Sequence, residues 1–238
     1  MNRSMSRKLK EFIYEKGASL VGFADLNMLP SQIRYGMDFG ISIAIALNPN
    51  IVEKINIGPT IEYQQEYWEI NKELDKLSSN VTEYILKEGY SAISFNATTG
   101  KYNPKIKQFD TKLPHKTVAT IAGLGFIGKC ALLINKKYGS AIRITTVLTN
   151  FPLIPDKPID RSLCGNCSLC VDGCPANAFN GREWTLGLYR DKFFNPSKCD
   201  KVKKEILIEK GLKQEICGIC IAVCPWTQNY IKNSKKLM

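Results

Sequence analysis

The spacing of apolar residues predicts helices alternating with strands over the first 150 residues. Residues 5–16 place their apolar side chains on one helical face, and Gly17 ends this predicted helix. Residues 60–88 carry apolar side chains at intervals of three and four, which predicts a second, long helix. Short apolar runs predict strands at 19–23, 41–47, 91–95, 132–134 and 141–149. This alternation is typical of an α/β layer domain.

A proline-rich stretch follows this pattern and suggests a domain boundary. Residues 151–160 hold three prolines and read as a linker. The cysteine-rich part of the chain comes next and has the size of a ferredoxin unit. We therefore predict a first domain over residues 1–155 and a second over residues 156–238.

The charge and the apolar runs narrow the class of protein. With 33 basic and 22 acidic residues, the 238-residue chain carries a formal charge of +11. A basic surface suits RNA, an acidic flavodoxin or a phosphate-bearing cofactor, although dispersed lysines need no partner at all. No apolar run approaches the ~20 residues that span a bilayer. The thiol content and the lack of an export signal favour the cytoplasm.

The cysteine spacing is the most specific signal. Residues 164–175 read C-x2-C-x2-C-x3-C-P, the ligand pattern of a bacterial-type 4Fe–4S site. A shorter copy, C-x2-C-x3-C-P, spans residues 217–225. Gln214 occupies the position of its missing first cysteine, and Cys199 is the nearest unassigned thiol upstream. Eight cysteines thus suffice for two clusters.

The two runs are expected to exchange one ligand. In paired sites the fourth thiol of a run ligates the other cluster. We therefore predict one cluster held by Cys164, Cys167, Cys170 and Cys224. The other would be held by Cys174, Cys199, Cys217 and Cys220. Structural zinc or a disulfide framework fits three closely spaced thiols before a Cys-Pro pair less well.

A glycine motif precedes the cysteines. Residues 123–128 match G-x-G-x-x-G, but a dinucleotide site also needs a preceding strand, a following helix and an acid about 20 residues later. No Asp or Glu occurs between residues 111 and 155. The glycines are better explained by close approach of the backbone to another group. The lysines and Arg143 of this acid-free window would face an anionic cofactor or substrate.

Taken in order, these motifs resemble those of the epoxyqueuosine reductases. The segments on which this resemblance rests are AGLGFIGK at 122–129, YGS at 138–140, LTNFPL at 148–153 and the two cysteine runs. The resemblance implies an α/β (α+β) nitroreductase-like domain followed by a ferredoxin-like domain with two 4Fe–4S clusters. It also implies base-off cobalamin as a cofactor. The chain resembles a short form without the C-terminal helical-repeat domain of many members.

The resemblance further implies site residues. His115, the only histidine, stands where the family has a carboxylic acid, and we expect it to donate a proton. The residues expected to contact the corrinoid are Tyr67, Gly123, Gly125, Gly128, Lys129, Gly139, Ser140 and Asn150. Cys130 lies outside both cysteine runs and is expected to be a buried apolar thiol. Trp226 is expected to shield a cluster from water.

The leading functional hypothesis is an iron–sulfur, cobalamin-dependent oxidoreductase of queuosine biosynthesis. Its partners would be a low-potential donor, flavodoxin or ferredoxin, and possibly tRNA. The substrate would be the epoxide of a modified tRNA base or another electrophilic molecule, since reductive dehalogenases share this plan. One alternative is a non-catalytic electron-transfer protein or corrinoid activator. Another is a flavin-dependent reductase on the same scaffold.

Overall fold

The computed structural model describes residues 2–98, 102–103, 108–109 and 112–236. Its helices are α1 (Asn2–Glu15), α2 (Pro49–Glu53), α3 (Ile61–Lys87), α4 (His115–Ile121), α5 (Leu169–Asp172), α6 (Pro196–Glu209), α7 (Ile219–Ala222) and α8 (Pro225–Lys235), with 3-10 turns η1 (Lys54–Ile57) and η2 (Arg190–Lys192). Its strands are β1 (Leu20–Asp25), β2 (Phe39–Ala46), β3 (Ala92–Phe95), β4 (Tyr102–Asn103), β5 (Gln108–Phe109), β6 (Phe126–Ile127), β7 (Leu133–Ile134) and β8 (Ile142–Thr149).

The described chain forms two compact units, each assembled from several segments. The first contains residues 1–45, 70–125 and 143–159. The second contains residues 46–69, 126–142 and 160–238. The boundary predicted between residues 155 and 156 lies near the last junction of these units, and the division into domains 1–155 and 156–238 stays a prediction.

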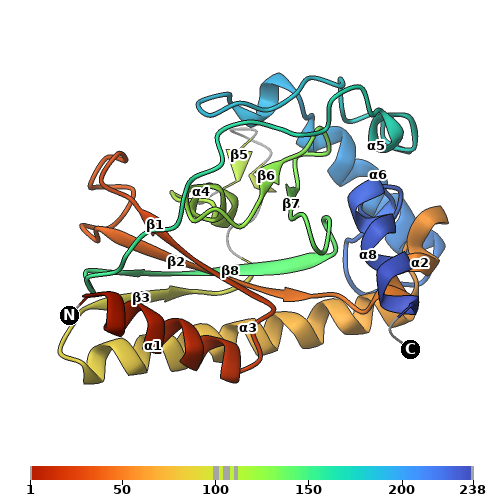
Figure 1. Ribbon diagram of the computed structural model, residues 1–238. Helices are drawn as coiled ribbons and strands as arrows, with labels where there is room; N and C mark the ends of the chain where they lie inside the picture. The colour runs from red at the N-terminus through yellow and green to blue at the C-terminus, as the bar shows by residue number, and fades with distance from the viewer. Residues whose placement is uncertain (1, 99–101, 104–107, 110–111, 237–238) are drawn as a thin grey trace. The chain divides into compact units, whose positions relative to one another are not determined.

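An open four-stranded sheet organises the first unit. Its strand order is β1-β2-β8-β3, with β1 antiparallel to β2 and β3 antiparallel to β8. Successive side chains of a strand point to opposite faces, so Val147 joins the apolar cluster with α1 and α3, while Leu148 joins the cluster with α4. Helices thus cover both faces of the sheet (Figure 1).

Helix α4 packs very closely on the sheet. A Cβ atom on Gly22 would lie 2.3 Å from the carbonyl oxygen of Ala122, and one on Gly40 would lie 2.7 Å from a methyl of Val118. Only glycine permits this approach. The two glycines therefore fix the position of α4, and with it the positions of His115 and of Gly123, where the glycine motif begins.

The second unit consists mainly of loops and short helices, and its helix starts are encoded locally. The side chain of Asn195 accepts the backbone N–H of Lys198, and Pro196 opens α6. Helix α8 likewise begins at Pro225, directly after Cys224. Strands β6 and β7 pair antiparallel, with Phe126 opposite Ile134. These short elements hold the cysteines in defined positions.

The predicted mixed α/β fold class is confirmed, and the structure shows that the sheet is open. The predicted long helix at 60–88 corresponds to α3. The segment before the glycine motif forms α4 and not a strand, and β6 lies within the motif. The strand–glycine–helix order of a dinucleotide site is therefore absent from these residues.

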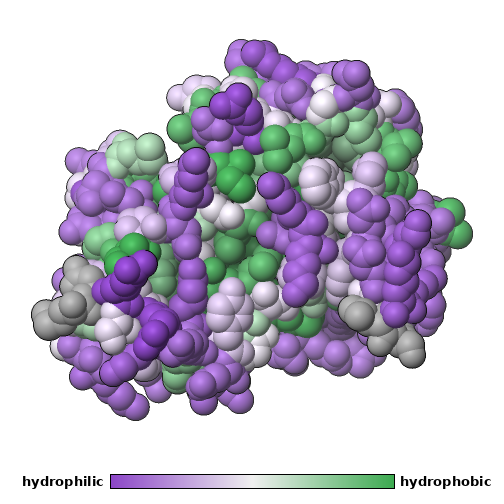
Figure 2. Space-filling view, viewed as in Figure 1, coloured by the Kyte–Doolittle hydropathy of each residue, from purple (hydrophilic) through white to green (hydrophobic). Residues whose placement is uncertain are grey.

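Hydrophilic side chains cover much of the face shown in Figure 2. Among the described residues, no helix is long and apolar enough to cross a membrane. The cytoplasmic location stays a prediction.

Candidate functional site

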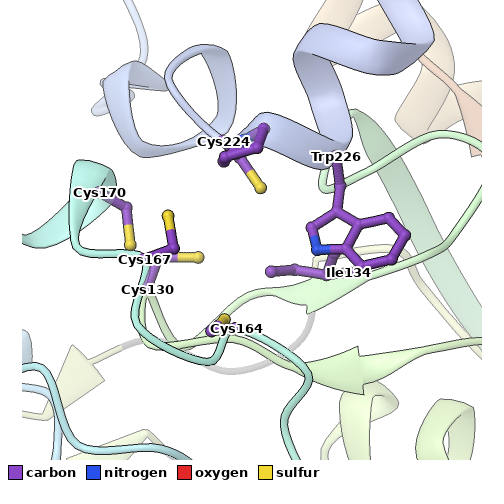
Figure 3. A pocket seen from close by; sticks show the side chains of 8 residues that line it. Cys130, Ile134, Cys164, Cys167, Cys170, Cys224 and Trp226 are labelled. Carbon is purple, nitrogen blue, oxygen red and sulfur yellow. The ribbon is translucent and has the colours of Figure 1, made fainter.

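One cavity of the second unit gathers cysteines from both runs. Cys164, Cys167 and Cys170 come from the loop before α5 and from α5 itself, and Cys224 precedes α8. Their side chains surround a common space (Figure 3). The cavity is about 140 Å³ in volume and is completed by Cys130, Ile134, Pro225 and Trp226. The structure therefore brings together the first predicted ligand set, and Trp226 lies at its edge as expected.

A second cavity gathers the other set. Its lining contains all four of the remaining predicted ligands, Cys174, Cys199, Cys217 and Cys220. Cys199 reaches the cavity from α6, as the displaced ligand would have to do. Phe179, Val202 and Ile219 add apolar walls to a space of about 40 Å³. The sulfur of Cys174 thus lies with the later cysteines and not with its own run.

The donor chemistry of both cavities fits iron–sulfur clusters. Thiolates are soft ligands that suit Fe–S clusters, and four are needed for each cube. Within the described part of the chain, no group of three or more His, Cys, Asp or Glu side chains is arranged to hold a single metal ion. Burial raises the pKa of Cys199 to about 11 and also raises the pKa values of Cys217, Cys220 and Cys224. Loading with iron must therefore displace protons.

Lys129 ties the first cysteine loop to the β6–β7 hairpin. Its ammonium donates hydrogen bonds to the carbonyl oxygens of Gly165 at 2.7 Å and Cys167 at 3.0 Å. The residue is buried, so these carbonyls replace its water shell. The backbone N–H of Gly165 in turn donates to the carboxylate of Glu183. Lys129 thus has a structural role here, and its expected contact with a corrinoid stays a prediction.

The sequence did not predict that Cys130 would lie beside the first ligand set. Cys130 is buried, as expected, but its thiol lies in the first cavity beside the four predicted ligands (Figure 3). A hydrogen bond from Cys130 lowers the pKa of Cys170 to about 7. The same contact, together with burial, raises the pKa of Cys130 well above its ordinary value. The only available signal was a ninth cysteine two residues after the glycine motif.

Gln214, at the position where a regular repeat would have a thiol, serves the packing of the second unit. Its side-chain oxygen accepts a hydrogen bond from the indole of Trp68 at 3.2 Å. Its backbone N–H donates to the side-chain oxygen of Gln64 at 3.0 Å. These contacts join α3 to the segment before Cys217, so this position holds the loop in place.

His115 is embedded in hydrogen bonds of the first unit. Its Nδ1 lies 2.8 Å from the hydroxyl of Thr146, and its Nε2 lies 2.9 Å from the carbonyl oxygen of Asn96. A carbonyl can only accept, so Nε2 carries the proton and Nδ1 of the neutral ring accepts from Thr146. Burial lowers the pKa of His115. Its expected role as proton donor stays a prediction.

At the glycines expected to contact a corrinoid, protein atoms occupy the space that a side chain would need. A Cβ on Gly123, where φ is +68°, would lie 2.5 Å from the carbonyl oxygen of Lys157. One on Gly139 would lie 2.3 Å from the backbone nitrogen of Thr227. Gly128 is closed in the same way by Ile134, and Gly125 is buried. Close packing against backbone atoms accounts for Gly123 and Gly139, and packing against the Ile134 side chain accounts for Gly128.

The remaining residues of that expected set also have internal roles. The backbone N–H of Ser140 donates to the hydroxyl of Thr227 at 3.1 Å. The side-chain oxygen of Asn150 accepts the backbone N–H of Ser91 at 2.8 Å. Tyr67 lies half-buried on α3. None of these contacts identifies a corrinoid-binding group, so the corrinoid contacts stay predictions, whereas the cysteine sets fit their clusters.

Comparison with known proteins agrees with the cysteine geometry. A family model described as a 4Fe-4S double cluster binding domain matches residues 163–227, a range that includes all eight predicted ligands. The epoxyqueuosine reductase of Cyclobacterium marinum is 36% identical over 119 residues, which cover 46% of this chain and 36% of that protein. The epoxyqueuosine reductase of Leadbetterella byssophila is 28% identical over 235 residues, covering 93% of this chain and 69% of that protein.

Reductive dehalogenases are similar as well. The tetrachloroethene reductive dehalogenase of Desulfitobacterium hafniense is 26% identical over 199 residues, covering 78% of this chain and 31% of that protein. A solved catabolic reductive dehalogenase aligns with a TM-score of 0.70 at 21% identity, covering 96% of this chain and 33% of that one. An epoxyqueuosine reductase solved with a tRNA stem loop aligns with a TM-score of 0.63 at 18% identity, and the alignment covers 97% of this chain and 67% of that one.

The chain spans only about a third of the length of the first curated relatives that it matches, 36% and 39% for two epoxyqueuosine reductases. The resemblance to the epoxyqueuosine reductases is nevertheless confirmed by several relatives of that name. The solved structures show that the fold is shared.

Proposed function

We propose that this chain is an iron–sulfur, cobalamin-dependent reductase similar to the epoxyqueuosine reductases. The observation that carries the proposal is the pair of cavities, each lined by four cysteines drawn from separate parts of the sequence. Electron carriers and redox enzymes both use such sites. The curated relatives that match most of the chain are reductases, which favours an enzyme.

Electron transfer between the proposed clusters is supported by the short chain segments that join their ligands. Cys164, Cys167, Cys170 and Cys224 would hold one cube, and Cys174, Cys199, Cys217 and Cys220 the other. Cys170 and Cys174 belong to different cavities but lie four residues apart in the chain, so their Cα atoms are at most about 14 Å apart. The second pair of linked ligands, Cys220 and Cys224, imposes the same limit. The two cubes must therefore be near neighbours.

Helix α6 offers a docking surface for the electron donor. It carries Cys199 of the second cavity and exposes Lys198, Lys201 and Lys204, of which Lys201 pairs with Glu205 and Lys204 with Asp200. Positive charge near a redox centre steers an acidic partner toward it. We therefore infer that a flavodoxin or ferredoxin delivers electrons at this helix, to the second cluster first.

The organic cofactor of the proposal is cobalamin, which would supply a cobalt centre able to reduce an electrophilic carbon. Support comes from the relatives, because one similar solved structure is described as suggesting a mechanism for B12-dependent dehalogenation. In this chain, His115 is the candidate proton donor. To act, it must release the Asn96 carbonyl to which its Nε2–H is bonded.

The proposed substrate is the epoxide of a modified tRNA base. A similar epoxyqueuosine reductase has been solved with an epoxyqueuosine-modified tRNA stem loop, and the formal charge of +11 suits a nucleic acid. The reductive dehalogenases favour a halogenated compound as the second candidate, since one of them has been solved with 3-bromo-4-hydroxybenzoic acid.

The test is a reduction assay with protein carrying both clusters and cobalamin. Epoxyqueuosine-containing tRNA and a reduced flavodoxin are supplied under anaerobic conditions, and the nucleosides are analysed by mass spectrometry. The proposal predicts loss of one oxygen atom from the modified base, and no change without the flavodoxin. A fully loaded protein that leaves the epoxide intact would exclude this substrate, and parallel incubation with a bromophenol tests the second candidate.

A further inference from the structure

The first cavity contains one thiol more than a cluster needs. Five cysteines line it, whereas four line the second cavity. A 4Fe–4S cube bound by protein thiolates takes four of them. The first cavity is also larger, about 140 Å³ against about 40 Å³. One cysteine of the first cavity is therefore available for another task, and the cysteine spacing identifies it as Cys130.

Cys130 is held in the cavity by its own turn. The turn runs from Gly128 to Ala131, closed by a 2.9 Å hydrogen bond from the Ala131 N–H to the Gly128 carbonyl. Ala131 has a φ of +57°, a conformation that costs a non-glycine residue about 1 kcal/mol or more. The preceding residue, Lys129, is anchored on two carbonyls of the cysteine loop. Contacts on both sides therefore fix the direction of the Cys130 side chain.

The partner of Cys130 is one of the predicted ligands. The thiols of Cys130 and Cys170 are in hydrogen-bonding contact, and both residues are buried. A thiol has one S–H donor, and a cluster-bound cysteine sulfur can only accept. Ile134 and Trp226 line the same cavity, so apolar groups limit the access of water to it. The S–H of Cys130 is thus a donor aimed at a ligand sulfur from the protein side.

We propose that Cys130 is not a ligand but a positioning residue whose S–H donates a hydrogen bond to the cluster-bound sulfur of Cys170 and thereby raises the reduction potential of the first cluster. The inference rests on the proposed function only in that the first cavity must hold a cluster. Reduction adds an electron to the cluster, and a hydrogen-bond donor at a ligand sulfur stabilises the added charge. In a buried site no water replaces a lost donor, so the effect persists.

The test compares variants of the chain reconstituted with both clusters. Cys130→Ala removes the donor, and Cys130→Ser replaces it with a hydroxyl donor. Ile134→Val is the matched control, because it trims the same cavity without touching a donor. Iron is counted in each protein, and the potentials of the two clusters are measured by redox titration followed by electron paramagnetic resonance.

Cys130→Ala is expected to keep eight irons per chain, four for each cluster, and to lower the potential of one cluster only. The expected change is about two- to tenfold in the equilibrium constant for reduction, the worth of one hydrogen bond. Cys130→Ser should restore most of the potential, and Ile134→Val should leave it unchanged.

Two results would overturn the inference: loss of four irons from both Cys130 variants, which would make Cys130 a ligand, or potentials in Cys130→Ala equal to those of the unchanged protein. Failure of the shared premise, a cluster in the first cavity, is distinguishable from either, because the unchanged chain itself would then bind fewer than eight irons. A chain that binds eight irons but no cobalamin would contradict the proposed reductase and leave this inference standing.

Discussion

At the scale of single residues, Lys129 links the glycine motif to the first cysteine loop. Replacing it with Met removes two hydrogen bonds from a buried ammonium, at 2.7 Å and 3.0 Å, and leaves the carbonyls of Gly165 and Cys167 unpaired. We expect Lys129→Met to lower the free energy of unfolding by about 2–3 kcal/mol and to speed iron release to a chelator. Lys136→Met, an equal charge change at an exposed position, is the control. Equal effects in the two variants would contradict this role.

The buried environment of His115 predicts a pH dependence. Burial lowers the pKa of His115 below its ordinary value of 6.5, so the unfolded chain takes up the proton first as the pH falls. Stability contributed by the neutral ring is therefore present above pH 6.5 and is lost as the pH falls through the lower pKa of the folded state. The difference in urea midpoint between the unchanged protein and His115→Gln should shrink from pH 7.5 to pH 5. A difference that stays constant over this range would be incompatible with a neutral, buried ring.

The division of eight cysteines between two cavities could be predicted, because Fe–S ligands follow a characteristic spacing in the sequence. The position of Cys130 could not. What brings Cys130 to Cys170 is the contact of Lys129 with the carbonyl oxygens of Gly165 and Cys167. Every residue has a backbone carbonyl, so such contacts leave no trace in the sequence. The same holds for the Asn96 carbonyl, which accepts the hydrogen bond from Nε2 of His115.

At the scale of elements, the turn between β7 and β8 packs against the start of α8. A Cβ on Gly139 would lie 2.3 Å from the backbone nitrogen of Thr227, whereas one on Gly89 would meet nothing within 4 Å. Both glycines have positive φ, +60° and +82°. Gly89→Ala should therefore lower the free energy of unfolding by only about 1 kcal/mol, the cost of placing a non-glycine residue at positive φ. Gly139→Ala should cost more than about 2 kcal/mol in unfolding free energy, since backbone atoms must also move. Similar losses in urea unfolding would disprove the close packing.

Elements with a strong periodic pattern could be predicted, and elements set by tertiary packing could not. The apolar rhythm of residues 60–88 specifies α3 by itself. The segment of α4 contains β-branched and apolar residues compatible with helix or strand. Its helical state is favoured by close packing on Gly22 and Gly40, which are distant in the sequence.

At the scale of the whole molecule, the two cavities predict which cysteines ligate the same cluster. Cys199 and Cys217 line the same cavity, so Cys199→Ala and the double variant with Cys217→Ala should each lose one cluster and retain four irons. Cys164→Ala combined with Cys199→Ala should lose both clusters, because Cys164 lines the other cavity. Iron and sulfide analysis after anaerobic reconstitution distinguishes these outcomes. Four irons retained by this last pair would show that the two cysteines share one site.

The mixed α/β class could be predicted from the alternation of patterns, but the composition of the compact units could not. Residues 46–69 and 126–142 belong to the same unit as the cysteine runs. They pack against that later part of the chain through contacts between distant residues, such as Gly218 with Ile55, Trp68 with Gln214 and Lys129 with Gly165. Contacts between residues far apart in the sequence produce no shift in composition that would mark a boundary.

The most direct test of the account is an anaerobic titration of the cluster-loaded protein with cobalamin, followed by absorption spectroscopy. The account predicts saturation near one corrinoid per chain, with the spectrum of the base-off form. It also predicts reduction of the bound corrinoid when a reduced flavodoxin is added, which the Cys199→Ala variant should not support. Protein with both clusters intact that binds no corrinoid at stoichiometric loading would contradict the central claim and leave an electron-transfer protein or a flavin reductase in its place.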